Sequence, residues 1–376
     1  MRRRPRLRTR AACGSAHVGH TITASTTGNE AAAMRAAIYD EQRRLVIQDK
    51  PVPEPEPGRV RLRIGAVGIC GTDLHMFHGK LGKVAGLQPG HEVAGHVDAV
   101  GDGVTLSADG LQLGGLVALE PITACGQCRH CLEGQYNRCH SQRLFGVTRK
   151  GGMAEYLTVP AERLFPVDAG IGCNVAALAE PLAVCARGVA MAELAPKSQV
   201  AILGAGTIGL MSIVAAQAAG AAGVHITARH PHQRALASSL GAQVHDSSEA
   251  MLAALGEDAV DVVIETVGGE AKTLTEAVNL VRRGGRIVML GVFEGAPRIP
   301  GLSFSTKELT LVGSNCYSNS HGHSDFGTGV QLLNANAARI APLVTHTYGL
   351  ADINTAFATA TDKASGSIKV QVEPQR

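Results

Sequence analysis

The sequence predicts an α/β plus β fold: an antiparallel, barrel-like β domain together with a domain built on a doubly wound parallel sheet. The chain has 376 residues, too many for one ordinary hydrophobic core, so two domains are expected. From Met34 to about Val159, short apolar runs are separated by Gly and Pro turn signals, as in β domains. From Ser198 onward, strand-like and helix-like apolar runs alternate, which indicates a parallel sheet with helices on both faces.

Residues 1–33 differ in composition from the rest of the chain. They hold six arginines and one acid, so they contribute +5 to a net charge of +3 and leave the remainder near −2. The remainder therefore gives no charge argument for nucleic-acid binding. No apolar run follows the arginines, as a secretion signal would require. We expect a disordered basic extension here, with the folded chain beginning at Met34.

The cysteines and the apolar runs indicate the compartment. There are nine cysteines, an odd number with four in one cluster, which fits reduced thiols and metal binding better than disulfides. Gly and polar residues interrupt the apolar runs before they reach membrane-spanning length. We expect a cytoplasmic protein with no membrane anchor and no nucleic-acid partner.

The expected elements follow from the apolar pattern and its breaks. In the first half, strands are expected at 45–47, 60–64 and 93–100. In the second half, strands are expected at 199–203, 223–227, 260–265 and 286–291, with helices at 207–219, 231–241 and 272–283. Beyond Gly313, we expect helices at 325–334 and 350–361, a polar loop at 318–323, and a last strand at 367–372 that returns to the first domain.

The stretch from Gly68 to His75 carries chemistry. It places the Cys70 thiol, the Thr72 hydroxyl, the Asp73 carboxylate and the His75 imidazole within six residues. A thiolate is a soft zinc ligand, a hydroxyl can hold a substrate alcohol, and an imidazole can move a proton near neutral pH. Taken alone, Cys70 is equally well explained as a buried cysteine in a turn.

Two downstream segments strengthen the metal interpretation. Gly90 precedes His91 and Glu92, and Glu180 stands before Pro181. Cys, His and Glu together can make a three-ligand zinc site with one position open to substrate. Glu180 is also a plausible first-turn acid of a helix.

Four cysteines form a second motif. Cys125, Cys128, Cys131 and Cys139 have the spacing Cys-x2-Cys-x2-Cys-x7-Cys, which matches a closed tetrahedral zinc site. An iron–sulfur cluster with this spacing usually has Pro after its last cysteine, and this chain has His there. We therefore expect structural zinc, with His130 as a neighbour and not a ligand.

A glycine-rich turn opens the α/β half. Gly204, Gly206 and Gly209 form Gly-x-Gly-x-x-Gly, with Thr207 and Ile208 between the last two, directly after a strand and before a helix. In that context the motif predicts dinucleotide binding, because the glycines let a pyrophosphate reach the helix N-terminus.

The end of the next strand reads Ala228-Arg229-His230. An NAD site has Asp or Glu at this point to hold the ribose hydroxyls. The acid is absent, and the Arg229 guanidinium can pair with a 2′-phosphate. The sequence thus favours NADP over NAD, the alternative being a solvated arginine in a loop.

The chain from Met34 to Val372 resembles the zinc-dependent medium-chain alcohol dehydrogenases, in particular the polyol (sorbitol) dehydrogenase branch. The matching pieces are GICGTDLH, PGHEVAGHV, CGQCRHC with Cys139, AEPLAV and GAGTIG, in family order. The resemblance implies a GroES-like catalytic domain over 34–181 and 317–376, interrupted by a Rossmann domain over 182–316. It also implies two zinc ions per chain, one catalytic and one structural.

Carried over by position, the resemblance makes Cys70 and His91 ligands of the catalytic zinc, with Glu92 or Glu180 as the third. Asp73 would orient a ligand or cap the turn. For the dinucleotide, the candidate contacts are Gly204, Gly206, Thr207, Ile208, Gly209, Ala228, Arg229, Leu290, Val292 and Lys369.

The resemblance also implies the reaction. Zinc lowers the pKa of the substrate alcohol, hydride passes to the nicotinamide, and Thr72 and His75 relay the proton. The substrate would be a secondary alcohol or polyol, or the matching ketone, and the enzyme a homodimer or homotetramer. Two alternatives are a threonine-type amino-alcohol dehydrogenase, against which Glu180-Pro181 speaks mildly, and a silent dinucleotide-binding sensor, against which the complete ligand set speaks.

Overall fold

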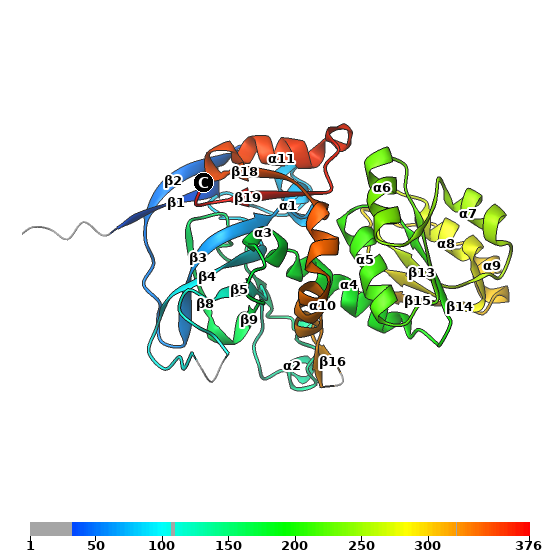
Figure 1. Cartoon of the computed structure of the whole chain (residues 1–376), viewed down its shortest axis with the longest axis horizontal. Coiled ribbons are helices and arrows are strands. Elements are labelled where there is room, and N and C mark those ends of the chain that lie inside the picture. The colour runs from blue at the N-terminus through cyan, green and yellow to red at the C-terminus, as the bar shows by residue number, and fades with distance from the viewer. Residues whose placement is uncertain (1–31, 107–109, 321) are drawn as a thin grey trace, which may run out of the picture. The chain divides into compact units, whose positions relative to one another are not determined.

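The structure is a computed structural model and describes residues 32–106, 110–320 and 322–376. The expectation of a disordered extension at 1–33 falls, apart from its last two residues, outside the described part. The fold class predicted from the sequence is confirmed, because a β domain and a parallel-sheet domain are both present (Figure 1).

The β domain is built from strands of both ends of the chain. Its strands are β1 (Ala33–Tyr39), β2 (Leu45–Pro51), β3 (Arg59–Gly68), β4 (Glu92–Val100), β5 (Leu116–Leu119), β6 (Ile122–Thr123), β7 (Arg143–Leu144), β8 (Tyr156–Pro160), β9 (Leu164–Pro166), β18 (Val344–Gly349) and β19 (Lys369–Glu373). Its helices are α1 (Gly71–Phe77), α2 (Arg129–Leu132), α3 (Cys173–Ala176) and α11 (Ile353–Thr361). Short 3-10 turns occur at Tyr136–Arg138, Ala161–Arg163, Ala341–Leu343, Leu350–Asp352 and Lys363–Ser365.

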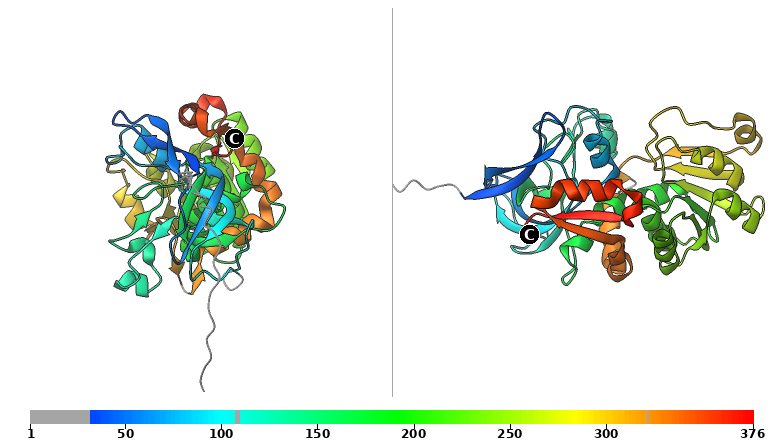
Figure 2. Two further views of the ribbon diagram at one scale, coloured as in Figure 1. Left: turned by 90° about the vertical axis from the view of Figure 1, so that its left-hand side faces the viewer. Right: turned by 90° about the horizontal axis from the view of Figure 1, so that it is seen from above.

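Within the described residues, the main sheet of this domain has the strand order β18-β19-β3-β4-β5-β9, and β8 also pairs with β3. Strand β3 alternates buried and less buried side chains along most of its length, as a sheet with one solvated face requires. The C-terminal strand β19 lies between β18 and β3 and runs antiparallel to β3, so the red end of the chain belongs to the same domain as its blue and cyan segments (Figure 2). This pairing brings Lys369 beside the motif that follows β3.

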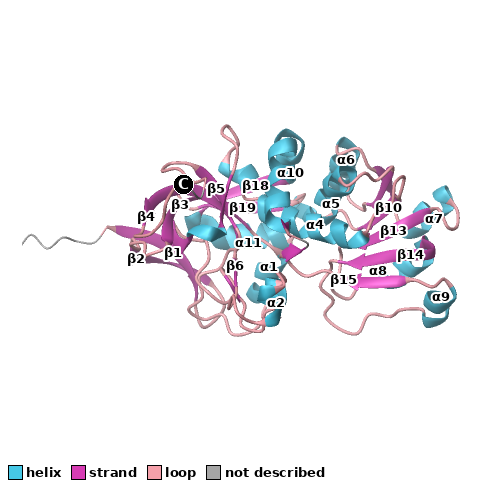
Figure 3. Cartoon of the chain, turned by 90° about the horizontal axis from the view of Figure 1, so that it is seen from below, coloured by secondary structure: helices cyan, strands magenta, loops and turns pink. Residues whose placement is uncertain are grey.

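The parallel-sheet domain has the order β12-β11-β10-β13-β14-β15 in the described part of the chain. These strands are β10 (Gln199–Leu203), β11 (Gly223–Thr227), β12 (Gln243–His245), β13 (Val260–Glu265), β14 (Val281–Met289) and β15 (Thr310–Gly313). The helices are α5 (Thr207–Ala218), α6 (Pro231–Ser239), α7 (Ser248–Leu255), α8 (Thr273–Leu280) and α9 (Gly301–Thr306). Helices lie on both faces of the sheet (Figure 3), because the inner strands β10, β13 and β14 bury apolar side chains on both sides.

Helix α4 (Ala179–Ala192) packs closely against α10 (Asp325–Ile340). A β-carbon added at Gly329 would lie 2.8 Å from backbone atoms of Ala183, so only glycine allows this approach. The segment Cys173–Ala192 is long and apolar enough to cross a membrane, but 78% of it is buried inside the protein. It is therefore a core helix.

Three element predictions need correction. The helix expected at 272–283 ends at Leu280, because Val281 is extended, fully buried and paired with Val260 in the sheet. The helix expected at 325–334 continues to Ile340, whose side chain is fully buried in the core. The loop expected at 318–323 contains two short paired strands, β16 (Asn319–Ser320) and β17 (His323–Ser324).

Candidate active site

Cys70 lies at the N-cap of α1, just after the end of β3. Its backbone is extended, and its N–H donates to Asp73 Oδ2 at 3.0 Å, so Asp73 closes the first turn of the helix. Gly68 is required beside it, because a β-carbon there would lie 1.8 Å from a Glu92 carboxylate oxygen. The Glu92 carboxylate therefore lies directly against the backbone of Gly68.

His91 and Glu92 stand at the start of β4, next to Cys70. Gly90 precedes them with φ +95°, a conformation that glycine adopts without strain. One ligand atom each of Cys70, His91 and Glu92 lie within 4.8 Å of one another. His91 and Glu92 are buried, and His91 Nδ1 lies 3.6 Å from Asp73 Oδ2. Asp73 therefore serves both roles considered for it, turn cap and neighbour of the histidine.

Glu180 lies just outside this group, in the first turn of α4. Its Oε1 accepts a hydrogen bond from the Tyr317 hydroxyl at 3.0 Å. Burial raises the pKa of the Glu180 carboxyl to about 7, while His91 acts in the opposite direction. Burial lowers the pKa of His91, but Asp73, then Cys70 and to a lesser extent Glu180 raise it well above its usual value.

Lys369 on β19 reaches the group from the other side. Its Nζ donates to both Glu92 oxygens at 2.7 Å and to the carbonyl of Ile69 at 3.1 Å. Burial alone would lower the pKa of Lys369, but Glu92 and Cys70 raise it, so the lysine stays charged. The ammonium group that was expected at the pyrophosphate is thus engaged with a candidate zinc ligand.

The residues of this group fit zinc. A thiol, an imidazole and a carboxylate converge in a buried place, which is a donor set that zinc accepts with one position left open. His91 Nδ1 has no hydrogen bond among the described residues but faces Asp73 Oδ2 at 3.6 Å, so Asp73 is placed to orient the ring of a ligand histidine.

The four cysteines of the second motif also converge. The sulfur of Cys125 lies 3.9 Å from that of Cys131 and 3.6 Å from that of Cys139, and the Cys128 and Cys131 sulfurs are 3.5 Å apart. Four sulfurs at a Zn–S distance of about 2.3 Å are about 3.8 Å apart in a tetrahedron. The spacing therefore fits a closed structural zinc. His130 is not one of the four and lies near the ring of His140.

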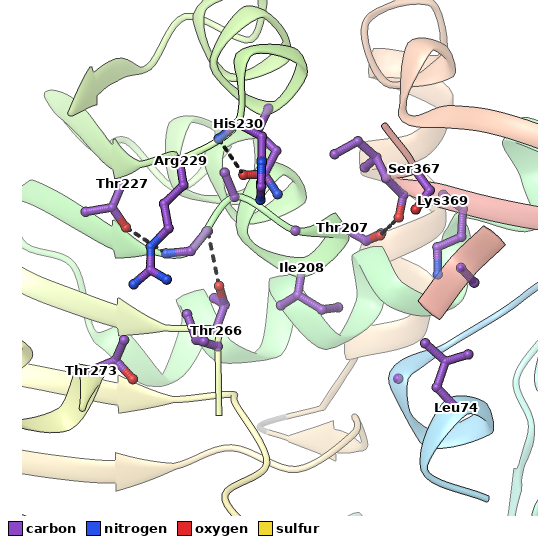
Figure 4. A pocket seen from close by; sticks show the side chains of 18 of the residues that line it. Leu74, Thr207, Ile208, Thr227, Arg229, His230, Thr266, Thr273, Ser367 and Lys369 are labelled. Carbon is purple, nitrogen blue, oxygen red and sulfur yellow. Dashed lines mark hydrogen bonds between the residues drawn. The ribbon is translucent and has the colours of Figure 1, made fainter. Parts of the chain in front are cut away.

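A groove of about 670 Å³ runs from Arg229 and His230 to Cys70 and Lys369. Figure 4 shows Arg229 at one end and Lys369 and Leu74 at the other. The glycine turn forms its floor: Gly204 has φ +100°, and a β-carbon at Gly209 would lie 1.9 Å from the Gly204 carbonyl. This is the close helix–strand packing that the motif predicts.

The predicted dinucleotide residues divide into two sets. Those that line the groove are Gly204, Gly206, Thr207, Ile208, Arg229 and Lys369; those that do not are Gly209, Ala228, Leu290 and Val292. Ala228 is buried and Val292 is exposed, while Leu290 packs against Gly188. Gly209 contributes by letting helix α5 pack closely on the glycine turn, whereas no contact in the groove supports the predicted role of Val292.

Several groove residues escaped the sequence analysis. Thr227 accepts a hydrogen bond from the Gly204 N–H at 2.9 Å, and Thr266 donates one to the Gly204 carbonyl at 3.2 Å, so both support the glycine turn (Figure 4). The run Asp246–Glu249 also lines the groove. A signal was present for all of them, since each follows the carboxyl end of a parallel strand.

Thr72 and His75 lie on α1, two and five residues after Cys70. Neither lines the groove, and His75 Nδ1 lies 3.5 Å from Glu294 Oε1. Lys80 also pairs with Glu294, at 2.7 Å. The acidic partner of His75 was not foreseen, because Glu294 lies more than two hundred residues away in sequence.

Comparisons with known proteins agree with this geometry. Residues 56–169 match the family model of the alcohol dehydrogenase GroES-like domain, and residues 207–335 match that of the zinc-binding dehydrogenase. The chain is 32% identical to sorbitol dehydrogenase of Bacillus subtilis over 91% of this chain and 98% of that protein. It is 34% identical to L-threonine 3-dehydrogenase of Pyrococcus furiosus over 79% of this chain and 86% of that protein.

Among solved structures, a zinc-binding dehydrogenase of Sinorhizobium meliloti 1021 bound to NADP matches with a TM-score of 0.82 and 30% identity, covering 91% of this chain and 100% of the other. The chain therefore belongs to the zinc-containing medium-chain alcohol dehydrogenase family. It is a zinc- and NAD(P)-dependent dehydrogenase with a catalytic Cys/His/Glu group and a structural four-cysteine site.

Proposed function

We propose that this enzyme transfers a hydride between a secondary alcohol or polyol, or the matching ketone, and NADP(H). The observation that carries the proposal is that Cys70 and Glu92, two members of the buried ligand group, line the same groove as the glycine turn. A substrate carbon at the ligand group and a nicotinamide in the groove would thus share one space. The similarity to sorbitol dehydrogenase favours a polyol.

In this proposal Cys70, His91 and one carboxylate hold the catalytic zinc, which supplies a Lewis acid that lowers the pKa of the substrate hydroxyl. Thr72 orients the hydroxyl and accepts its proton, and His75 passes the proton toward solvent. Glu294, 3.5 Å from His75 Nδ1, stabilises the imidazole when it is protonated. The four cysteines from Cys125 to Cys139 hold the structural zinc.

The choice of the third ligand involves two carboxylates. Glu92 lies within the tight group, but Lys369 compensates its charge. Glu180 accepts a hydrogen bond from the neutral Tyr317 hydroxyl and lies close enough to His91 to affect its pKa. We propose that Glu180 takes the third ligand position, while Lys369 holds Glu92 beside the group.

The nucleotide preference rests on Arg229. Its side chain lines the groove and is exposed, as a group that pairs with a 2′-phosphate would be. Asp246 lines the same end of the groove but forms an ion pair with Arg234, which reduces its repulsion of a phosphate. The similar Sinorhizobium meliloti dehydrogenase was solved with NADP.

The test of this preference is a titration with NADPH and NADH, followed by the fluorescence of the bound nicotinamide. We expect NADPH to bind at least about tenfold more tightly, which corresponds to about 1.4 kcal/mol. Arg229→Ala should remove the difference, while Arg149→Ala, a change of an exposed arginine in the β domain, should leave it unchanged. Equal binding of the two nucleotides by the unaltered enzyme would show that Arg229 does not read the phosphate.

Substrate class is tested separately, with sorbitol, other polyols, simple secondary alcohols and L-threonine at saturating nucleotide. The similarity to L-threonine 3-dehydrogenase keeps an amino-alcohol as the second candidate. We expect kcat/KM to be highest for a polyol or secondary alcohol. A clear preference for L-threonine would favour the alternative, and no turnover with any of them would favour a sensor.

The remaining proposals concern organisation. We propose that residues 34–181 and 317–376 form the catalytic domain, that 182–316 form the Rossmann domain, and that the enzyme is a homodimer or homotetramer. The mass in solution, measured by light scattering, decides the last point.

A further inference from the structure

One short segment connects the two candidate metal sites. It comprises Asn315 to Asn319, between β15 and β17, and will be called the bridging segment. Cys316 within it has φ +54°, a left-handed conformation that costs a non-glycine residue about 1–2 kcal/mol. Such strain persists only where the surroundings hold the backbone in place. The contacts of the neighbouring residues show what holds it.

Tyr317 points from this segment into the core. Its side chain is fully buried, and its hydroxyl donates to Glu180 Oε1 at 3.0 Å. The ring packs edge-on against Phe326, with centroids 5.3 Å apart, and Phe326 packs on Phe165 at 4.9 Å. Aromatic packing on one side and a single polar contact on the other leave the phenol little freedom. One oxygen of Glu180 therefore has a fixed partner.

Ser318, the next residue, fixes the bridging segment to α4, the helix that carries Glu180. Ser318 donates its N–H to Asp325 Oδ2 at 2.8 Å, and Arg187 of α4 donates to both the Ser318 hydroxyl and Asp325. Arg187 lies seven residues after Glu180, two helical turns along one face of α4. Tyr317 and Ser318 thus hold α4 at two points, which sets the helix position as well as the carboxylate.

Residues Cys125 to Cys139 will be called the cysteine-rich lobe. The lobe holds the bridging segment by hydrogen bonds. Asn137 donates its side-chain amide to the Asn315 carbonyl at 2.9 Å, and the Asn319 N–H donates to the Gly134 carbonyl at 2.9 Å. A β-carbon at Gly134 would lie 2.2 Å from the Asn319 carbonyl, so the lobe and the segment are in direct contact. These contacts flank Tyr317 on both sides.

We propose that Tyr317 is a positioning residue for Glu180, and that the cysteine-rich lobe sets the geometry of the catalytic metal group through the bridging segment. The tyrosine does not line the nucleotide groove; in this proposal it acts by keeping one Glu180 oxygen occupied, which leaves the other for the ligand group. This inference rests on the proposed role of Glu180 as a zinc ligand. It gives the four-cysteine site a function beyond local stability.

The first experiment replaces Tyr317 by Phe, which removes only the hydroxyl and keeps the ring packing. The matched control is Tyr348→Phe, which removes a phenol contact to Thr359 between β18 and α11. The measurement is the release of zinc to a chelator from the intact enzyme, counted as one or two ions per chain. We expect Tyr317→Phe to release the catalytic zinc about 10- to 100-fold faster, as loss of a partner that orients a ligand does. The four-cysteine zinc, the NADPH affinity and the control should be unchanged.

Two further variants test the coupling. Asn137→Ala removes the lobe's donor and should accelerate the release of the catalytic zinc in the same direction but by less. Combining Tyr317→Phe with Glu180→Ala should give no further effect beyond Glu180→Ala alone, because the tyrosine acts only through that carboxylate. Wild-type zinc release in Tyr317→Phe, or an additive effect in the double variant, would overturn the inference. An unaltered enzyme that works with only the four-cysteine zinc would instead overturn the proposed function.

Discussion

The two candidate metal sites are built in opposite ways. The four cysteines of the lobe lie within fifteen residues of chain, on turns and the short helix α2 near the surface. The catalytic group takes Cys70 from the start of α1, His91 and Glu92 from the start of β4, and Glu180 from α4. Its three acidic or imidazole side chains are buried and Cys70 is half-buried, whereas Cys125 is exposed and two further cysteines of the lobe are half-buried.

The two sites therefore depend on the rest of the fold to different extents. The lobe closes its own ligand shell locally, so it needs the body of the protein only as an anchor. The catalytic group exists only when β3, β4, β19 and α4 are all in place, and each ligand there has a partner from elsewhere in the chain. Local and tertiary perturbations should therefore affect the two sites differently.

The largest effect is expected at the catalytic group. Cys70→Ser replaces a thiolate by a weak ligand and should lower kcat by more than the 10- to 100-fold typical of residues around a metal. Nucleotide affinity should stay near the wild-type value, because the glycine turn is untouched. Steady-state kinetics and NADPH titration measure both. Near-normal turnover in this variant, with the catalytic zinc absent, would break the comparison.

A stability effect is expected at the lobe. Cys128→Ser removes one of four thiolates, and because zinc binding at a closed site contributes directly to folding, the lobe should lose its ion. We expect Tm to fall by about 3–6 °C, the shift that a loss of roughly 2 kcal/mol gives in a chain of this size. Calorimetry and zinc analysis are the measurements. The catalytic zinc should remain bound at first, and its simultaneous loss would show that the two sites are not separable.

A stability effect of similar size, without loss of an ion, should follow from a change where the lobe is anchored to the β domain. Tyr136 is buried, donates to Glu120 and stacks with Arg163, which also pairs with Glu120 at 2.9 Å. Tyr136→Phe leaves the buried carboxylate with one partner fewer, a cost of about 1–3 kcal/mol. Denaturant unfolding measures the cost. A neutral result would mean that the Arg163 pairing alone satisfies Glu120.

The smallest effect is expected at a pair of residues that belongs to neither site. His225 Nδ1 lies 3.3 Å from His245 Nε2 on neighbouring strands β11 and β12. Burial lowers the pKa of both histidines. Nearby groups lower each pKa further, His245 that of His225 and Arg234 that of His245.

Because the folded state binds protons less readily than the unfolded chain, the pair lowers the unfolding free energy as the pH falls through 6.5 toward the depressed values. His225→Gln should reduce the loss of stability between pH 7 and pH 5, measured as the denaturant midpoint. An identical pH profile in wild type and variant would assign the acid sensitivity to the metal sites alone.

Prediction from sequence succeeded where the signal is local. The four cysteines, the strand–glycine–helix turn and the identity of Cys70 and His91 follow from spacing and residue chemistry. It failed where a strand competes with a helix, as at Val281, which leaves α8 because its side chain fills the sheet interior opposite Val260. It also missed Glu294 beside His75 and Tyr317 beside Glu180, since nothing in the local pattern of either residue indicates its partner.

The sequence by itself determined the fold class, the ligand types and the dinucleotide motif, because these depend on periodicity, glycine conformation and donor chemistry within short stretches. Only the tertiary structure decided the partners. Lys369, predicted as a dinucleotide contact, lines the groove and also holds Glu92, because β19 pairs with β3 across three hundred residues of chain. Electrostatic pairing depends on distance in space, and that distance is set by the assembled sheet and helices.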